Sequence, residues 1–155
     1  MWLVPLYSVF TVDALSLPRL QAGGLDGVLG SLATQTWSPD LETPENATFV
    51  AEFKEKYGSY PSFYAAQAYD ALFFIKTAVE ANGGDVDNVD TLRTAMQNVT
   101  YLPTRGEMKM GPNHFPIQNV YLREAVTDAD GNWTTKIVST VYEDHQDPYA
   151  GECKF

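Results

Sequence analysis

The amino-acid sequence predicts an α/β fold, and the order of its segments leads to that prediction. Two short apolar runs separated by a helix-forming segment come first. Three helical segments follow in succession, and two long extended runs joined by a turn-forming stretch close the sequence. Three helices without an intervening strand need a sheet to cover, and these residues supply little of one. We therefore expect the chain to form part of a larger structure.

Composition and charge narrow the possible functions. The 155 residues are 45% hydrophobic and 19% charged, which is typical of a folded domain with a buried core. The formal net charge is −10, and Lys and Arg do not cluster. These features argue against nucleic acid and against an anionic membrane surface as partners. No run approaches the roughly 18 apolar residues needed to span a bilayer.

Neither end of the sequence carries a clear targeting or disulfide signal. The first residues lack the basic start, long apolar stretch and cleavage site of a signal peptide. We expect either a cytoplasmic protein or one whose amino terminus lies upstream of Met1. Cys153 is the single cysteine, so no disulfide can form within the chain. It is either a free thiol in a frayed tail or the partner of a cysteine elsewhere in a secreted parent protein.

The first 40 residues follow the order of a βαβ unit. Residues 3–7 form a short apolar run that predicts a buried strand, with Pro5 at an edge or an irregular entrance. Residues 16–22 predict two turns of helix, and residues 27–33 predict a second buried strand. A polar, proline-containing crossover is expected over residues 36–40.

The middle of the chain predicts three helices. Asn46 is the predicted N-cap of the first, which runs to Tyr57 and ends at Gly58. The second spans about residues 62–81, and its wide apolar face predicts that it is mostly buried. The third covers residues 90–99.

The last third predicts extended structure. Residues 106–110 indicate a short strand, and residues 120–126 and 133–142 indicate longer ones. The intervening residues 128–132, Asp-Ala-Asp-Gly-Asn, have the chemistry of a hairpin turn. The polar tail from Glu143 is expected to be loose.

Several segments in this order resemble one known family. Residues 49–58 end in Lys-Tyr-Gly, and Pro61 and then Tyr69-Asp70-Ala71 follow. Residues 105–114 are similar to a glycine-flanked strand with an Asn-His turn, and Gly131-Asn132-Trp133 is similar to a closing hairpin. Together they resemble the type I periplasmic binding proteins, more narrowly the branched-chain amino-acid and aromatic-acid receptors of ATP-driven importers. The resemblance covers nearly all of this chain but only the second half of the family.

The resemblance implies a partial type I fold with two incomplete lobes, helices packed on sheets and a final antiparallel hairpin. Residues 1–38 would belong to the carboxy-terminal lobe and residues 39–118 to the amino-terminal lobe. Residues 119–155 would return to the carboxy-terminal lobe as the hairpin and tail. The sheet covered by the three helices would lie in the other half of the protein.

Open α/β sheets bind ligands beyond the carboxyl ends of their strands and at nearby helix amino termini. This rule selects the loop after the first predicted strand and the start of the long helix. The candidate ligand-binding residues are Tyr7, Ser8, Phe10, Thr11, Tyr64 and Gln67. The aromatic members could equally be core residues, whereas the amide of Gln67 could orient a carboxylate or hydroxyl. Tyr69 and Asp70 are interpreted as structural.

The resemblance also bears on the kind of ligand. Amino-acid receptors of this family commonly place an acidic residue after Ala-Gly to pair with the ligand's ammonium group, and here Gly24 stands at that position. Asp26 could substitute through a shift in register. We therefore favour an aromatic carboxylate slightly over a branched-chain amino acid.

Catalytic and metal-binding chemistry finds no support in the sequence. Asp128, Asp130 and Asn132 resemble the start of a calcium loop, but Ser139 stands where a bidentate Glu belongs. The two histidines, His114 and His145, lack ligand spacing, and no nucleophile motif is present. We expect neither a cofactor nor a metal site.

These inferences favour a binding module over an enzyme. The leading hypothesis is the extracytoplasmic solute-binding component of an ABC-type importer, which closes on a small organic acid or amino acid and is recognised by the membrane permease subunits. The location implied for the parent protein is periplasmic or extracellular. The alternatives are a ligand-sensing regulator or receptor domain that uses the same cleft, and an unrelated α/β enzyme. Because the chain would expose sheet edges and apolar helix faces, a homodimer of this chain is also expected.

Overall fold

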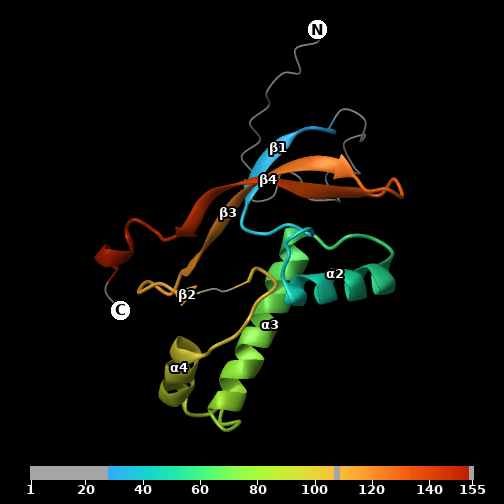
Figure 1. The fold of residues 1–155 in the computed structure, drawn as a ribbon. Helices are drawn as coiled ribbons and strands as arrows, with labels where there is room; N and C mark the ends of the chain where they lie inside the picture. Colours follow the sequence, from blue (N-terminus) through green and yellow to red (C-terminus); the bar gives the residue numbers. More distant parts are fainter. Residues whose placement is uncertain (1–27, 107–108, 154–155) are drawn as a thin grey trace.

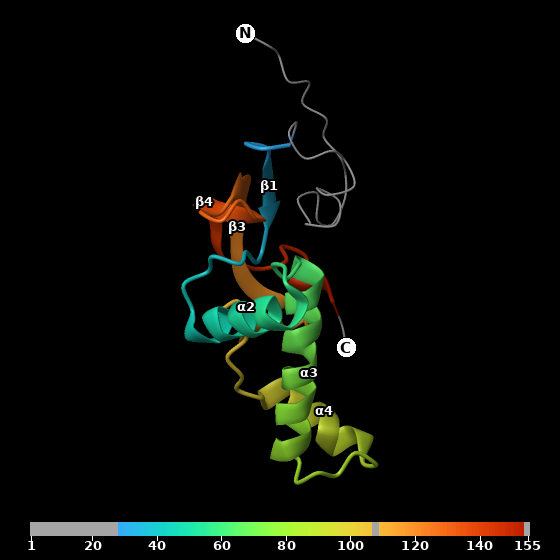
Figure 2. The same ribbon diagram turned by 90° about the vertical axis from the view of Figure 1, so that its right-hand side faces the viewer.

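The computed structural model describes residues 28–106 and 109–153. In chain order the elements are β1 (Leu32–Gln35), α2 (Pro44–Tyr57), α3 (Phe63–Ala81), α4 (Val89–Asn98), β2 (Lys109–Met110), β3 (Pro116–Thr127), β4 (Trp133–His145) and the short 3-10 helix η2 (Ala150–Glu152). The strands lie on one side of the molecule and the three α-helices on the other (Figures 1 and 2). The predicted α/β class is therefore correct.

The sheet is antiparallel and is built around β3. Strand β1 pairs with β3 on one side, with Leu32 opposite Glu124, and β4 pairs with β3 on the other, with Trp133 opposite Thr127. Strand β2 joins the start of β3. The predicted turn over residues 128–132 is confirmed, because the Asp128 carboxylate accepts backbone N–H bonds from within it. Both hairpin strands extend beyond their predicted limits.

The N-cap of helix α2 lies three residues before the predicted one. Thr43 is the N-cap, and its hydroxyl accepts the backbone N–H of Asn46 at 3.1 Å. Pro44 occupies the first turn, which suits its fixed φ and missing N–H. Gly58, at a φ of 69°, ends the helix as predicted. Asn46 is not the cap because its side chain lies inside the fold and is used elsewhere.

The main core lies between α2, α3 and the crossover. It consists of Trp37, Phe49, Val50, Phe63 and Ala66. The first turn of α3, capped by the Ser62 hydroxyl, delivers Phe63 and Ala66 to this core. The aromatic rings contact one another, with the Phe49 and Tyr69 centroids 4.7 Å apart.

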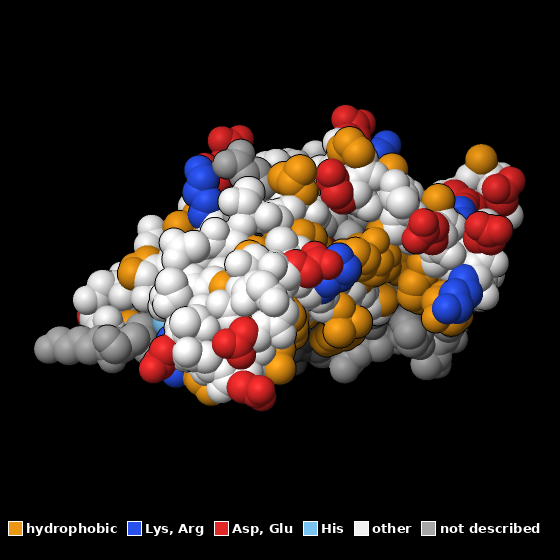
Figure 3. All heavy atoms as spheres, turned by 90° about the horizontal axis from the view of Figure 1, so that it is seen from below, with side chains coloured by type: hydrophobic (Ala, Val, Ile, Leu, Met, Phe, Trp, Pro, Cys, Tyr) orange, Lys and Arg blue, Asp and Glu red, His pale blue; other side chains and the backbone are white. Residues whose placement is uncertain are grey.

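Helix α3 spans the predicted range, but the prediction that it is mostly buried is wrong. Leu72 is 69% exposed, Ile75 48% and Tyr64 46%. With Ala68 these residues follow helical spacing and form one face of α3, which we call the α3 stripe. Nothing in the described part of the chain covers this face. Figure 3, which views the molecule from the helical side, shows hydrophobic side chains at the surface among scattered acidic ones.

Helix α4 and two strands differ from prediction at their ends. Helix α4 begins and ends one residue before the predicted range of 90–99, and Asn88 is its N-cap. Residues 28–30 form a turn with Gly30 at a φ of 79°, so the strand predicted over residues 27–33 begins only at Leu32. Gly106 also lies in a turn, which shortens the strand predicted over residues 106–110 to β2. The strand predicted at residues 3–7 and the helix at 16–22 lie outside the described residues.

The tail is more ordered than predicted. Strand β4 continues to His145, and the backbone N–H of Asp144 donates to the Asn119 side chain at 2.9 Å. Further on, the Asn113 amide donates to Asp147 at 2.8 Å, and Ala150 is buried. These contacts with the start of β3 and its preceding turn hold the segment in place.

Among the described helices, none combines the length and apolar character required to cross a membrane.

Candidate functional site

The helical side and the sheet are connected by the crossover at residues 36–43, which is fixed to α2 by one buried side chain. The Trp37 indole N–H donates to the Asn46 amide oxygen at 2.8 Å. The Asn46 amide nitrogen donates to the carbonyls of Ser38, Pro39 and Leu41. Trp37 is 1% exposed and Asn46 0%. A single asparagine side chain therefore provides hydrogen-bond partners for the indole N–H and for three backbone carbonyls where the chain passes between the two layers.

The same crossover is bonded to the sheet. The hydroxyls of Ser38 and Thr135 lie 3.1 Å apart. One Asp40 carboxylate oxygen accepts the Ser38 hydroxyl at 2.5 Å, and the other accepts the backbone N–H of Ile137 at 2.8 Å. Because β4 is an outer strand of the described sheet, Asp40 satisfies a backbone donor that β3 does not reach.

After α4 the chain passes from the helical layer back to the sheet. Asp70 of α3 holds the start of this second passage in place. Its carboxylate accepts the Tyr101 hydroxyl at 3.0 Å, the backbone N–H of Thr104 at 2.8 Å and the Arg105 guanidinium at 3.2 Å. Arg105 also donates to Gln118 of β3 at 2.9 Å. Burial, together with the neighbouring Asp70 charge, raises the pKa of Tyr101 far above its usual value. The structural role predicted for Asp70 is confirmed, and Tyr69 packs beside it in the aromatic core.

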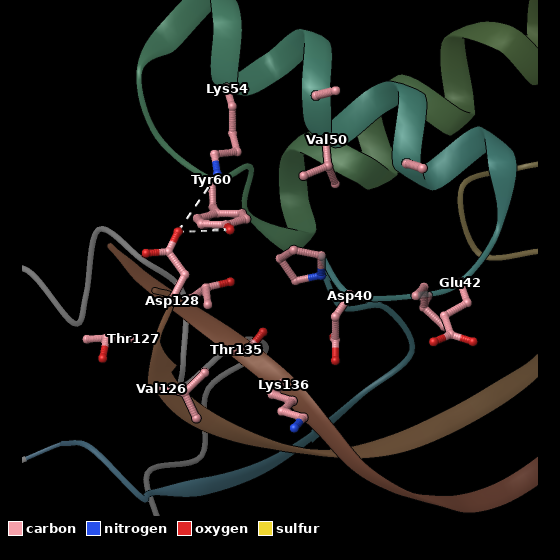
Figure 4. Close-up of a pocket in the computed structure, with 15 residues that line it drawn as sticks. Asp40, Glu42, Val50, Lys54, Tyr60, Val126, Thr127, Asp128, Thr135 and Lys136 are labelled. Atoms are coloured by element: carbon pink, nitrogen blue, oxygen red, sulfur yellow. Dashed lines mark hydrogen bonds and ion pairs between the residues drawn. The ribbon is translucent and has the colours of Figure 1, made fainter. Parts of the chain in front are cut away.

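Between these two layers lies an open cleft of about 830 Å³ (Figure 4). Helix α2 forms one wall and the end of the β3–β4 hairpin forms the other. Much of its lining is apolar, and charged groups stand at its rim. The lining residues are Pro39, Asp40, Leu41, Glu42, Ala47, Val50, Ala51, Lys54, Tyr60, Val126, Thr127, Asp128, Thr134, Thr135 and Lys136.

At the hairpin end of this cleft, Asp128 meets two residues of the helical side. It accepts the Tyr60 hydroxyl at 3.1 Å, and the Lys54 ammonium lies 3.8 Å away. Hydrogen bonds from Asn132 hold the pKa of Asp128 below its usual value. Contact with Tyr60 raises the pKa of Lys54, so both charges persist at neutral pH. Sequence reasoning missed this contact, because Tyr60 and Asp128 are separated by 68 positions.

The predicted ligand residues are only partly within the described structure. Tyr64 and Gln67 both lie in the first turns of α3 and are exposed. They do not line the cleft between α2 and the hairpin. Tyr7, Ser8, Phe10 and Thr11 lie outside the described residues, so their contribution to a binding site stays a prediction.

A metal site is absent from the described residues, because no three His, Cys, Asp or Glu side chains gather there. Asp128, the first residue of the calcium-like triplet, instead accepts hydrogen bonds within its own turn and from Tyr60. The acidic turn is therefore used to close the hairpin.

The described residues form an antiparallel sheet and a layer of three α-helices, and the chain passes between the two layers twice. The family model for periplasmic binding proteins matches residues 6–132, so the chain belongs to that family. The family is one of binding proteins rather than enzymes, and the similar solved structures include solute-binding proteins of ABC transporters.

Individual relatives bind two classes of solute according to their names. Leu/Ile/Val-binding protein homolog 6 of Brucella abortus is 32% identical over 126 residues, which cover 79% of this chain and 32% of the relative. A solute-binding protein of an ABC transporter from R. palustris, solved with benzoate, is 29% identical with a TM-score of 0.75, covering 88% of this chain and 36% of that one.

Two further structures extend this comparison. A solute-binding protein of Rhodopseudomonas palustris HaA2, solved with p-hydroxybenzoic acid, is 26% identical with a TM-score of 0.74, covering 92% of this chain and 39% of that one. The leucine-binding protein LivK of Thermotoga maritima, 24% identical with a TM-score of 0.66, shares the fold, covering 83% of this chain and 35% of that one. This chain thus spans about a third of the length of the curated relatives it matches.

Proposed function

We propose that the protein containing this chain is the extracytoplasmic solute-binding component of an ABC-type importer. The observation that supports it most is the family match over residues 6–132, together with structural similarity to solute-binding proteins of ABC transporters. Its partners are a small-molecule solute and the permease subunits of the importer. Its location is periplasmic or extracellular.

The solute is a small organic acid or amino acid, and an aromatic carboxylate is favoured. Gly24 stands where amino-acid receptors of the family commonly place an acidic partner for the ammonium group, and Asp26 could replace that partner through a shift in register. Relatives solved with benzoate and p-hydroxybenzoic acid support this choice, whereas the relative named for Leu, Ile and Val supports the amino acid.

The division into lobes is part of the same proposal. Residues 1–38 and 119–155 belong to one lobe and residues 39–118 to the other. The crossover contacts of Ser38 and Asp40 with β4, and of Arg105 with Gln118, then lie at the hinge. The solute site includes Tyr64 and Gln67 from one lobe and Tyr7, Ser8, Phe10 and Thr11 from the other.

Calorimetric titration of the complete protein with benzoate, 4-hydroxybenzoate and L-leucine tests both the site and the solute class. Gln67→Ala and Phe10→Ala should each weaken binding of the preferred solute about fivefold or more, because each removes a polar or apolar contact. Gln97→Ala, at an exposed glutamine of α4, is the matched control and should bind normally.

Unchanged affinity in both site variants would contradict the residue assignment. Tight binding of L-leucine with none of the benzoates would reverse the preference for an aromatic acid. Failure of all three compounds and of a wider panel of organic acids and amino acids would contradict the solute class itself.

A further inference from the structure

The cleft between α2 and the β3–β4 hairpin is bridged at the hairpin end by a contact of three side chains. We propose that Lys54, Tyr60 and Asp128 form a strut between the helical layer and the sheet, which fixes how far apart the two layers stand. The strut is the contact of Asp128 with Tyr60 and Lys54. It does not depend on the identity of the solute.

The three groups come from both layers and meet closely. Tyr60 lies in the loop between α2 and α3, Lys54 lies on α2, and Asp128 begins the hairpin turn. The Tyr60 hydroxyl donates to Asp128 Oδ2 at 3.1 Å, and Lys54 Nζ stands 3.8 Å from the same oxygen. Lys54 Nζ also lies 4.0 Å from the centre of the Tyr60 ring, so the two partners of Asp128 hold each other in position. Figure 4 shows Lys54 and Tyr60 pointing from the helical side toward Asp128.

Asp128 is held in place before it meets the other layer. Its Oδ1 accepts the backbone N–H groups of Asp130 at 3.0 Å and Asn132 at 2.8 Å. The Asn132 amide adds a bond of 3.1 Å to Oδ2. A carboxylate already oriented by its own turn loses little freedom when it accepts the Tyr60 hydroxyl, so the net gain from that bond is larger.

The strut lies apart from the other contacts between the two layers. The layers are joined at the crossover, where Ser38 and Asp40 bond to Thr135 and Ile137 of β4. Asp128 lies further along, where the hairpin turns, with the open cleft of about 830 Å³ in between. The Arg105–Gln118 contact is the other join between the layers. Asp128 lies beyond both joins along β3, so its contact with the helical layer adds a third fixed point that any change in the spacing of the layers must break.

Paired spin labels test the strut without any solute. In the complete protein carrying Cys153→Ser, labels at Glu55→Cys of α2 and Ala129→Cys of the hairpin turn report the distance between the layers by pulsed EPR. Both positions are exposed. Tyr60→Phe removes only the hydroxyl, and Lys54→Met removes only the charge at similar side-chain length.

Each variant should lower the population ratio of the bridged arrangement to more open arrangements by about 3- to 10-fold. The distribution of distances between the two spin labels should then be broader and extend to longer distances. Tyr57→Phe is the matched control, because it removes a hydroxyl from an exposed tyrosine at the end of α2. It should leave the distribution of distances unchanged. Distributions for Tyr60→Phe and Lys54→Met that superimpose on the parent's would overturn the proposal. Because no solute is added, this outcome is independent of whether the importer function is correct.

Discussion

The indole N–H of Trp37 donates to the side-chain oxygen of Asn46 at 2.8 Å, in a position where both residues are sealed from solvent. The asparagine amide nitrogen also donates to three backbone carbonyls of the crossover, those of Ser38, Pro39 and Leu41. One side chain in the first turns of α2 thus fixes the path by which the chain leaves the sheet and enters the helical layer.

Asn46→Ala should therefore destabilise the protein strongly. The substitution leaves the Trp37 N–H and the carbonyls of Ser38, Pro39 and Leu41 buried without this partner. We expect the free energy of unfolding to fall by about 2–4 kcal/mol, measured by urea denaturation of the complete protein. Asn98→Ala, at an exposed asparagine that bonds within α4, should cost about 0.5 kcal/mol or less. Equal losses in the two variants would refute the role given to Asn46.

Asp40 should protect one amide of the sheet edge. Asp40→Ala removes the acceptor of the Ile137 N–H, which lies on the side of β4 away from β3. Exchange of that amide with deuterium should accelerate about 10-fold, because its hydrogen bond is lost while the β3–β4 ladder remains. NMR-detected hydrogen exchange measures this, and Glu42→Ala at the exposed neighbouring acid is the control. An unchanged Ile137 rate would show that another group protects the amide.

Tyr101 should make the protein sensitive to alkaline pH. Burial and the Asp70 charge raise its pKa in the folded state, whereas the unfolded chain releases the proton near the ordinary value of 10.0. The folded state then holds more protons than the unfolded state above pH 10, so stability that is complete below this pH falls as the pH rises.

Urea denaturation between pH 9 and 11 measures this slope. Tyr101→Phe should flatten it, while costing about 1 kcal/mol at neutral pH through the lost bond to Asp70. Tyr142→Phe, at an exposed tyrosine, is the matched control. A slope as steep in Tyr101→Phe as in the parent would assign the alkaline loss to other groups.

The 155-residue chain by itself should self-associate through the α3 stripe. Leu72, Ile75 and Tyr64 expose a continuous apolar face, and burying it against a second copy removes that surface from water. Light scattering of the isolated chain should give the mass of a dimer. The double substitution Leu72→Lys and Ile75→Lys should return it to a monomer, whereas a parent chain that is already monomeric would contradict the prediction.

The local signals in the sequence predicted most of the helices and the hairpin. Such signals act through hydrogen bonds to residues a few positions away, so they can be recognised in the sequence. Examples are Ser62, Gly58 and the turn from Asp128 to Asn132. Predictions based on local chemistry were wrong where a distant partner competed. Asn46 has the right chemistry for an N-cap, but Trp37 holds its side chain in the core, and Thr43 caps the helix.

The residues of the candidate site also differ in how far they could be found from the sequence. The rule on strand and helix ends selected Tyr64 and Gln67 as ligand candidates, which stays a prediction. It could not find the contact of Tyr60 and Lys54 with Asp128, which lies far away in the sequence. The sequence by itself determined the α/β class, the order of the elements from residue 28 onward and the family resemblance, because these depend on local periodicity and turn chemistry. Only the tertiary structure decided which face of α3 stays exposed and which side chains bridge the cleft, because those depend on contacts between residues far apart in the chain.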